Sequence, residues 1–186
     1  MARKSEVEAL RAALKMREGE LEVISAIQRG VAGGLDFQGI VDLVGDKLRE
    51  VFRTGDVGIL WWDQDTDMIH ALYRYEHGVP LKRRAPRKLE RDQPRDRPIF
   101  QIINSRQAAV VNTRAEQTAR GMSPAPGTDW AHSIVGVPII GSDRVLGLLS
   151  MQNHEREYAY GEAEVRLLQT IASSLPRRIP WSYESS

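Results

Sequence analysis

One short stretch of the sequence, MQNHEREYAYGEAE at residues 151–164, gathers side chains that bind metals and transfer protons. Its candidate metal ligands are His154, Glu155 and Glu157. Ligands to one ion must be three or four residues apart on a helix, or must alternate on a strand. Glu155 and Glu157 alternate, but His154 would point to the opposite face. The spacing therefore argues against a metal site, and we predict none.

A second acidic motif, DQDTD, has the start of a calcium-binding loop. Asp63, Asp65 and Asp67 would fill the first, third and fifth positions of such a loop. The loop then requires a glycine and a glutamate where this chain has Met68 and Arg74. A hairpin turn accounts better for the motif.

Catalysis by an activated nucleophile has little support in the sequence. The adjacent pair His132–Ser133 lies in an apolar, strand-like run, where neighbouring side chains point to opposite faces. The chain has no Gly-x-Ser-x-Gly motif, no phosphate-binding glycine-rich loop with lysine and no dinucleotide fingerprint. It also has no cysteine, which excludes disulfides, thiolate metal sites and pigments linked through a thioether. We therefore expect a protein that is not an enzyme.

Composition and charge indicate one globular domain with an extension. The chain has 186 residues, of which 41% are hydrophobic and 27% charged, with a formal net charge of +1. Such a balance does not predict nucleic acid or an anionic membrane as a partner. No apolar run is long enough to cross a bilayer, and the first thirty residues lack the apolar core of a signal peptide. We expect a cytoplasmic protein without membrane insertion.

Residues 82–97 form a strongly basic stretch, with eight basic and three acidic side chains. Because no aromatic residues are interleaved for stacking on bases, an exposed loop or edge strand is favoured over a nucleic-acid site. One of its arginines could instead reach a pocket and pair with an anionic ligand.

The first helix carries a heptad-like seam. Its apolar residues recur at spacings of three and four, with Arg17 and Gln28 at two seam positions, and they are Val7, Leu10, Leu14, Leu21, Ile24 and Val31. This seam predicts a coiled-coil helix that makes a homodimer. The alternative is a helix that lies on its own domain, and Val23 and Ile27 widen the stripe in that direction.

The remaining pattern predicts an α+β fold with a mostly antiparallel sheet. A helix at 37–51 precedes a hairpin made from DVGILWWD and MIHALYRY, and a short helix begins at Pro98. A brief strand at 109–111, a mobile loop at 114–130, a second hairpin from residue 133 and a helix ending before Pro176 follow. Strict alternation in the first hairpin predicts one face for Ile69, Ala71, Tyr73 and Tyr75, and the other for His70 and Arg74.

The segment HSIVGVPIIGSDRVLGLLSMQNHEREYAYGEAEVRLLQTIA resembles the closing half of a GAF domain. The resemblance rests on a Ser-aliphatic-x-small-Val-Pro strand, a turn, a Gly-aliphatic strand and a final helix. The residues that carry it are Ser133, Ile134, Gly136, Val137, Pro138, Leu146, Gly147, Leu148, Glu164, Leu167 and Leu168. It extends upstream, more weakly, to about Leu35.

The resemblance implies a six-stranded sheet with the first and last helices on one face, and loops with short helices over a small-molecule pocket on the other. The expected parts are a coiled-coil helix at 1–34, a GAF-like domain at 35–176 and, at 177–186, a tail that is disordered or foreign to the domain. Family members bind cyclic nucleotides, tetrapyrroles, haem or other small molecules. The small methionine-sulfoxide reductases of this fold would need active-site cysteines, which this chain lacks.

The cyclic-nucleotide signature of the family is half lost here. Asn153 keeps the first position, His154 stands in place of a lysine, Tyr160 in place of a phenylalanine, and Glu164-Val165 in place of an acidic pair. Because those residues mainly tie a loop to a helix, cyclic nucleotide is not excluded, and the ligand stays unknown. The match to this signature also implies that His154 lies in the loop at the end of a strand.

The candidate ligand-binding residues are aromatic or polar side chains on the elements expected near the pocket. They are Trp61, Tyr73, Tyr75, Trp130 and Ser133. Trp61 and Tyr73 could equally be core residues. The predicted function is a sensory domain that binds a small molecule and signals through dimer helices to an adjoining effector. The alternative is a ligand-free module for dimerisation or protein interaction.

Overall fold

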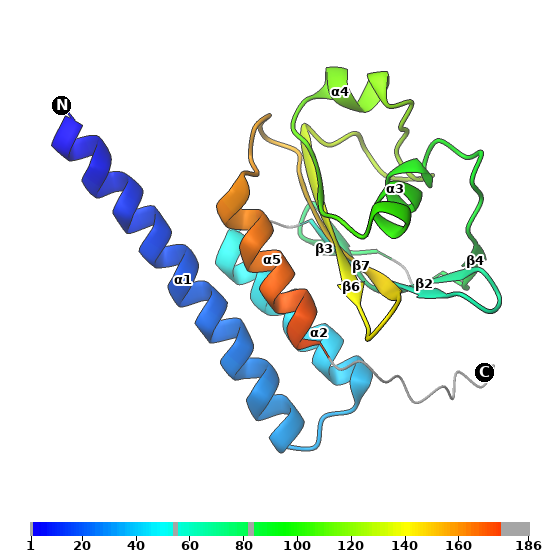
Figure 1. Ribbon diagram of the computed structural model, residues 1–186, viewed down its shortest axis with the longest axis horizontal. Helices are drawn as coiled ribbons and strands as arrows, with labels where there is room; N and C mark the ends of the chain where they lie inside the picture. Colours follow the sequence, from blue (N-terminus) through cyan, green and yellow to red (C-terminus); the bar gives the residue numbers. More distant parts are fainter. Residues whose placement is uncertain (1, 54–55, 82–83, 176–186) are drawn as a thin grey trace.

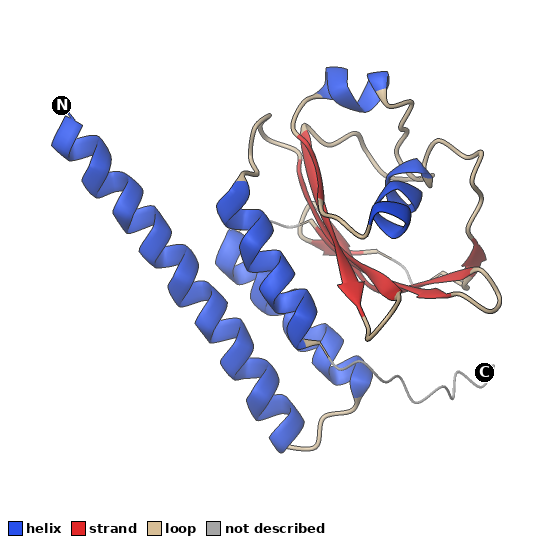
Figure 2. Cartoon of the chain, in the orientation of Figure 1, coloured by secondary structure: helices blue, strands red, loops and turns tan. Residues whose placement is uncertain are grey.

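The computed structural model describes residues 2–53, 56–81 and 84–175, which form layers on both faces of one sheet (Figure 1). Helices α2 (Phe37–Phe52) and α5 (Glu162–Ser174) cover one face, and the long helix α1 (Ala2–Ala32) lies on their outer side. Helices α3 (Arg97–Ser105) and α4 (Arg114–Ala119) lie on the other face with the long loops (Figure 2). This confirms the predicted α+β arrangement. The predicted tail, 177–186, lies outside the described residues.

The sheet is antiparallel, with strand order β3-β2-β1-β7-β6-β5. The two predicted hairpins are β1 (Val57–Asp63) with β2 (Met68–Glu76), and β6 (Ser133–Ile140) with β7 (Val145–Asn153). Strand β5 (Ala109–Val111) ends one edge, while β3 (Val79–Pro80) and β4 (Arg87–Lys88) both pair with β2. The sheet therefore has seven strands in place of six, because two short strands share one partner.

The DQDTD motif forms the predicted hairpin turn between β1 and β2. Asp63 accepts a hydrogen bond from the Asp65 N–H at 3.0 Å and another from the Thr66 hydroxyl. The bond from Thr66 lowers the pKa of Asp63. Asp67 accepts from Trp62 Nε1–H at 3.0 Å. The acidic side chains therefore satisfy the turn itself.

Helix α1 packs on its own domain and still exposes the predicted seam. Val23 and Ile27 are buried in the core that α1 shares with α2 and α5. Close approach to α2 depends on Gly19, where a Cβ would lie 2.6 Å from Val51 Cγ1. The seam residues other than half-buried Ile24 are 45–64% exposed, and they are Val7, Leu10, Leu14, Leu21 and Val31. The helix is confirmed, and pairing through its seam stays a prediction.

The main core lies between the sheet and α2, α5 and α1. Tyr73 of β2 packs on Gly45 of α2, where a Cβ would lie 2.4 Å from Tyr73 Cζ. The Tyr73 hydroxyl donates to Asp46 Oδ1 at 2.7 Å, and burial raises the pKa of Tyr73. On the same side, Trp61 packs edge-on against Phe37 of α2, with ring centroids 5.5 Å apart. Trp61 and Tyr73 are therefore core residues of the helix-covered face.

A β-bulge in β2 divides the residues that strict alternation had placed together. The register shifts between Ile59 and Leu60 of β1, so that Leu72 of β2 is an extra residue. An extra residue reverses the alternation of side chains that follow it along the strand. The predicted single face was therefore wrong, because Ile69 and Ala71 lie on the side of α3, whereas Tyr73 and Tyr75 lie on the side of α2.

The described part of the basic stretch is an ordered loop with the short edge strand β4. Asp96 is fully buried and accepts from both terminal nitrogens of Arg87, at 2.7 Å from Nη1, and from the Glu90 N–H at 3.0 Å. Leu89 is buried beside α3. Residues 84–96 therefore form the predicted loop with an edge strand, but the expectation of an exposed segment was wrong at Leu89 and Asp96, which are buried. Arg97 already belongs to α3, and residues 82 and 83 lie outside the described part.

Within the part of the chain that the structure describes, no helix has both the length and the apolar character needed to cross a lipid bilayer.

Candidate ligand-binding site

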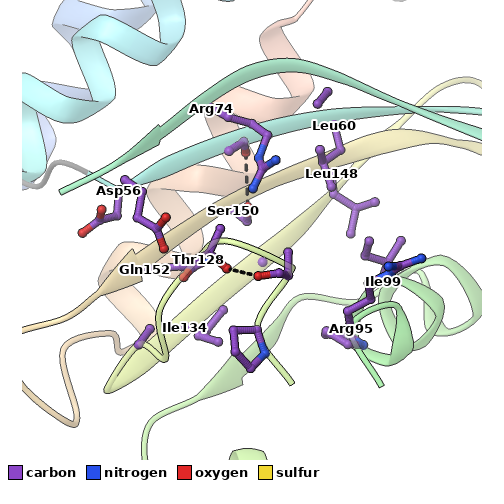
Figure 3. Close-up of a pocket in the computed structure, with 18 of the residues that line it drawn as sticks. Asp56, Leu60, Arg74, Arg95, Ile99, Thr128, Ile134, Leu148, Ser150 and Gln152 are labelled. Carbon is purple, nitrogen blue, oxygen red and sulfur yellow. Dashed lines mark hydrogen bonds between the residues drawn. The ribbon is translucent and has the colours of Figure 1, made fainter. Parts of the chain in front are cut away.

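A cavity of about 270 Å³ lies on the face of the sheet opposite α2 and α5 (Figure 3). Helix α3 and the loop at 122–131 enclose it. Small and aliphatic residues from β1, β2, β6 and β7 form its floor, and they are Gly58, Leu60, Ala71, Ile134, Gly136 and Leu148. The volume is just below the roughly 300–1,000 Å³ of most ligand pockets, which favours a small molecule.

Arg74 is the cation best placed to meet a ligand in this cavity. It follows the bulge in β2 and extends over the floor (Figure 3). Burial lowers the pKa of Arg74, and the nearby cations Arg84 and Arg87 lower it further, while Glu76 opposes them. Arg84 donates to the Pro126 carbonyl at 2.9 Å, whereas no acceptor for the Arg74 guanidinium is found within residues 2–53, 56–81 and 84–175. A partly buried cation in this state favours an anionic group beside it.

Carboxylates line another part of the cavity. Asp56, Glu76 and Asp129 all contribute to its wall. Asp56 accepts from the His77 N–H, and the Asp129 N–H donates to Glu76 Oε1 at 3.0 Å. The cavity therefore combines an apolar floor with charges of both signs, which favours a polar ligand over a wholly apolar one.

The segment between β5 and β6 covers the cavity and is partly helical. Thr113 accepts from the Glu116 N–H at 3.0 Å, and the Glu116 carboxylate accepts from the Asn112 N–H at 2.7 Å, which starts α4. Buried Gln117 donates to the Ala131 carbonyl at 2.8 Å. The expectation of one continuous loop at 114–130 was therefore wrong at its start, because Thr113 and Glu116 begin a helix.

The five candidate ligand residues do not gather at one place. Trp130 lines the cavity, and the Arg114 guanidinium lies 3.5 Å above the centre of its ring. Tyr75 borders the cavity, but its ring stacks on Tyr73 at 5.0 Å and lies under Arg49 of α2. Trp61 and Tyr73 lie in the core described above.

Ser133 has a structural position instead of one in the cavity. Its side chain is fully buried, and its hydroxyl donates to the Arg156 carbonyl at 2.9 Å and accepts from the Ala159 N–H at 3.3 Å. Both partners belong to the loop between β7 and α5. The hydroxyl therefore fixes this loop, while the adjacent His132 is exposed.

The same loop shows what the altered nucleotide signature does. Asn153 Oδ1 accepts from the N–H groups of Glu155 and Arg156, at 2.9 and 2.8 Å. Glu164 Oε2 accepts from the Gly161 N–H at 2.8 Å at the start of α5. Asn153 therefore holds the loop itself, and Glu164 joins the end of the loop to α5. His154 lies at the end of β7 as expected, but its side chain is only 9% exposed.

The main cavity residue that the candidate set missed is Arg74. It alternates with Tyr73 and Tyr75, so the assignment of those two rings to the core would have placed Arg74 on the opposite face. The prediction that an arginine of the basic stretch could reach a pocket is confirmed, because Arg84, Arg87 and Arg95 all line the cavity.

Residues 34–175 match the family model described as the GAF domain. The chain belongs to the GAF domain family. Among solved structures, it resembles the GAF domain of an Acinetobacter phosphoenolpyruvate-protein phosphotransferase, with a TM-score of 0.66 and 15% identity over 83% of this chain and 89% of that one. A likeness at this identity shows the GAF fold alone.

Two further solved structures show which kinds of protein share this fold. The phycocyanobilin-bound GAF domain of a cyanobacterial phytochrome has a TM-score of 0.63 and 18% identity over 84% of this chain and 91% of that one. The free methionine-R-sulfoxide reductase of Neisseria meningitidis, in complex with its substrate, has a TM-score of 0.62 and 18% identity over 89% and 87%. Among curated proteins, no sequence matches the chain.

Proposed function

We propose that this GAF domain is a regulatory sensor that binds a small organic anion in the cavity beside Arg74. The observation that carries the proposal is the guanidinium of Arg74, which is partly buried over an apolar floor and repelled by Arg84 and Arg87. A carboxylate or phosphate group would accept two hydrogen bonds from the planar guanidinium and offset the repulsion. Trp130 would close over the rest of the ligand.

Transmission of the signal would use the layers of the fold. Figure 1 shows α3, α4 and the long loops on one side of the sheet, and α1, α2 and α5 on the other. The cavity lies on the side of α3. We infer that ligand binding favours one position of the loop at 122–131 and one packing of these helices. The exposed seam of α1 would join two copies and report the change across a homodimer to an adjoining effector.

Catalysis is not part of the proposal. The chain has no cysteine for sulfoxide chemistry, and the hydroxyl of Ser133 is already bonded to the loop after β7. We also propose a cytoplasmic location for this sensor.

A thermal-shift screen against small carboxylates, sugar phosphates and cyclic nucleotides tests the anion site, with mass spectrometry of any molecule that co-purifies. A ligand at a hundred times its dissociation constant raises the free energy of unfolding by about 2.7 kcal/mol, which is several degrees here. Arg74→Gln and Trp130→Ala should each abolish the shift. Arg144→Gln, an exposed arginine in the β6–β7 turn, should retain it. A shift that survives Arg74→Gln refutes the assigned site.

Sedimentation equilibrium tests the homodimer. Replacing Leu10 and Leu14 with glutamate should give a monomer with an unchanged circular dichroism spectrum, because both side chains are exposed on α1. A double change of exposed Lys15 and Arg11 to glutamine is the control. A wild-type chain that is monomeric at high concentration refutes pairing through the seam. If the chain dimerises and no ligand binds, the ligand-free dimerisation module is the better description.

A further inference from the structure

A second cluster of chemistry-bearing side chains lies where three neighbouring strands end. Glu76 and His77 stand at the end of β2, Asp56 precedes β1, and His154 follows β7. One ligand atom from each of Glu76, His77 and His154 lies within 4.8 Å of the others. Spacing along the sequence argued against a metal site made within residues 151–164. In the fold, however, His154 lies beside Glu76 and His77, which are almost eighty positions away in the sequence.

The buried imidazole of His154 points to a ligand in this cluster. Its side chain is 9% exposed, and Nε2 has no hydrogen-bond partner among the described residues. The same nitrogen lies 4.0 Å from Asp56 Oδ2 and 4.0 Å from Glu76 Oε1. Those two carboxylates are also buried, with side-chain exposures of 10% and 11%. An imidazole nitrogen between two buried carboxylates, too far from either for a hydrogen bond, leaves room for an ion.

We propose that Glu76, His77 and His154 bind one divalent transition-metal ion of the Zn²⁺ class. Two imidazoles and a carboxylate suit zinc, nickel, copper or iron better than calcium or magnesium, which prefer oxygen ligands alone. With bonds of about 2.0–2.2 Å, the donors of a tetrahedral site are about 3.3–3.6 Å apart. The ligand atoms of the three residues lie within 4.8 Å of one another, so side-chain shifts would bring them to that separation.

The surroundings hold the donors in the way that metal-bound residues are usually held. Asp129 Oδ2 lies 3.2 Å from His77 Nε2, and a carboxylate at the second nitrogen commonly orients a metal-binding histidine. The Asp129 N–H donates to Glu76 Oε1 at 3.0 Å, and Asp56 accepts from the His77 N–H. The ion would also place positive charge beside the buried carboxylate of Glu76. This site adjoins the cavity but does not depend on a ligand at Arg74.

The test uses the full chain after treatment with a chelator and dialysis, titrated with Co²⁺ and then with Zn²⁺. We expect one Co²⁺ per chain, visible absorption bands of a site with nitrogen and oxygen ligands, and displacement by Zn²⁺. His154→Gln and His77→Gln should each weaken Co²⁺ binding at least about tenfold. His70→Gln, the same change near the other end of β2, is the matched control and should bind Co²⁺ like the wild type.

Each other outcome overturns the proposal. Absence of Co²⁺ and Zn²⁺ binding would mean that His154 only pairs with Asp56 and Glu76. Unchanged affinity in His77→Gln, or an equal loss in His70→Gln, would place any bound metal elsewhere. His77 is about half exposed, so its variant should fold normally and decides the question even if His154→Gln does not fold.

Discussion

Replacement of Asp96 by asparagine tests whether one buried carboxylate organises the basic loop. Asparagine has nearly the same shape and can still accept from the Glu90 N–H, so the change removes mainly the charge-assisted pair with Arg87. Breaking a fully buried pair costs about 3–5 kcal/mol, but the Arg87 side chain is 38% exposed and can be hydrated once released. We expect the free energy of unfolding to fall by about 2–3 kcal/mol.

Urea denaturation followed by circular dichroism measures this loss. A double-mutant cycle compares the wild type with Asp96→Asn, Arg87→Gln and the variant that carries both changes. We expect a coupling energy of at least about 1 kcal/mol between the two positions, because their side chains are bonded directly. Asp92→Asn makes the same chemical change at an exposed position of the same loop and should stay within about 0.5 kcal/mol of the wild type.

Two results would refute the reasoning. If Asp96→Asn costs less than about 1 kcal/mol, the loop does not depend on the pair. If the two single losses simply add in the double variant, the carboxylate and the guanidinium contribute through other partners.

Three further changes probe the core and its pH dependence. Tyr160→Phe should raise the free energy of unfolding by about 1 kcal/mol in a urea titration, because the buried hydroxyl has no hydrogen-bond partner among the described residues. Gly45→Ala should lower the free energy of unfolding by about 1–2 kcal/mol, because crowding of the new methyl group against Tyr73 outweighs the better helix propensity of alanine. A stabilised variant would contradict the close packing of Tyr73 on Gly45. Burial lowers the pKa of His70 from its usual 6.5, so the unfolded chain binds more protons and the free energy of unfolding falls on acidification below about pH 6.5. In His70→Gln, a plot of the free energy of unfolding against pH should be flatter in that range. An unchanged plot would assign the pH dependence to other groups.

The sequence predicted the elements well because their signals are local. Helical spacing identified α1, α2 and α5, and the turn residues around Asp63 identified the first hairpin. The family resemblance then supplied the layers that periodicity alone does not fix. Element ends and short strands were less predictable, since β3 and β4 consist of two residues each and exist only through pairing with β2.

The candidate site was harder to predict because it depends on which face a side chain occupies. The bulge at Leu72 decides that Arg74 faces the cavity and Tyr73 faces α2, and no local pattern marks the bulge. The cluster of Glu76, His77 and His154 joins the ends of β2 and β7, so spacing along the chain carries no information about it. Trp130 was predictable because an aromatic residue beside a polar loop suits the edge of a pocket.

The extra residue in β2 also affects how GAF sequences can be aligned. A chain without Leu72 would keep every partner that β2 has on β1, at the cost of the packing of this one buried side chain. Loss of a residue from the regular strand β1 would instead reverse all side chains beyond it. We therefore expect relatives to differ by a one-residue gap at this point of β2. An alignment that puts the gap elsewhere in the strand would exchange residues that line the cavity for residues of the core.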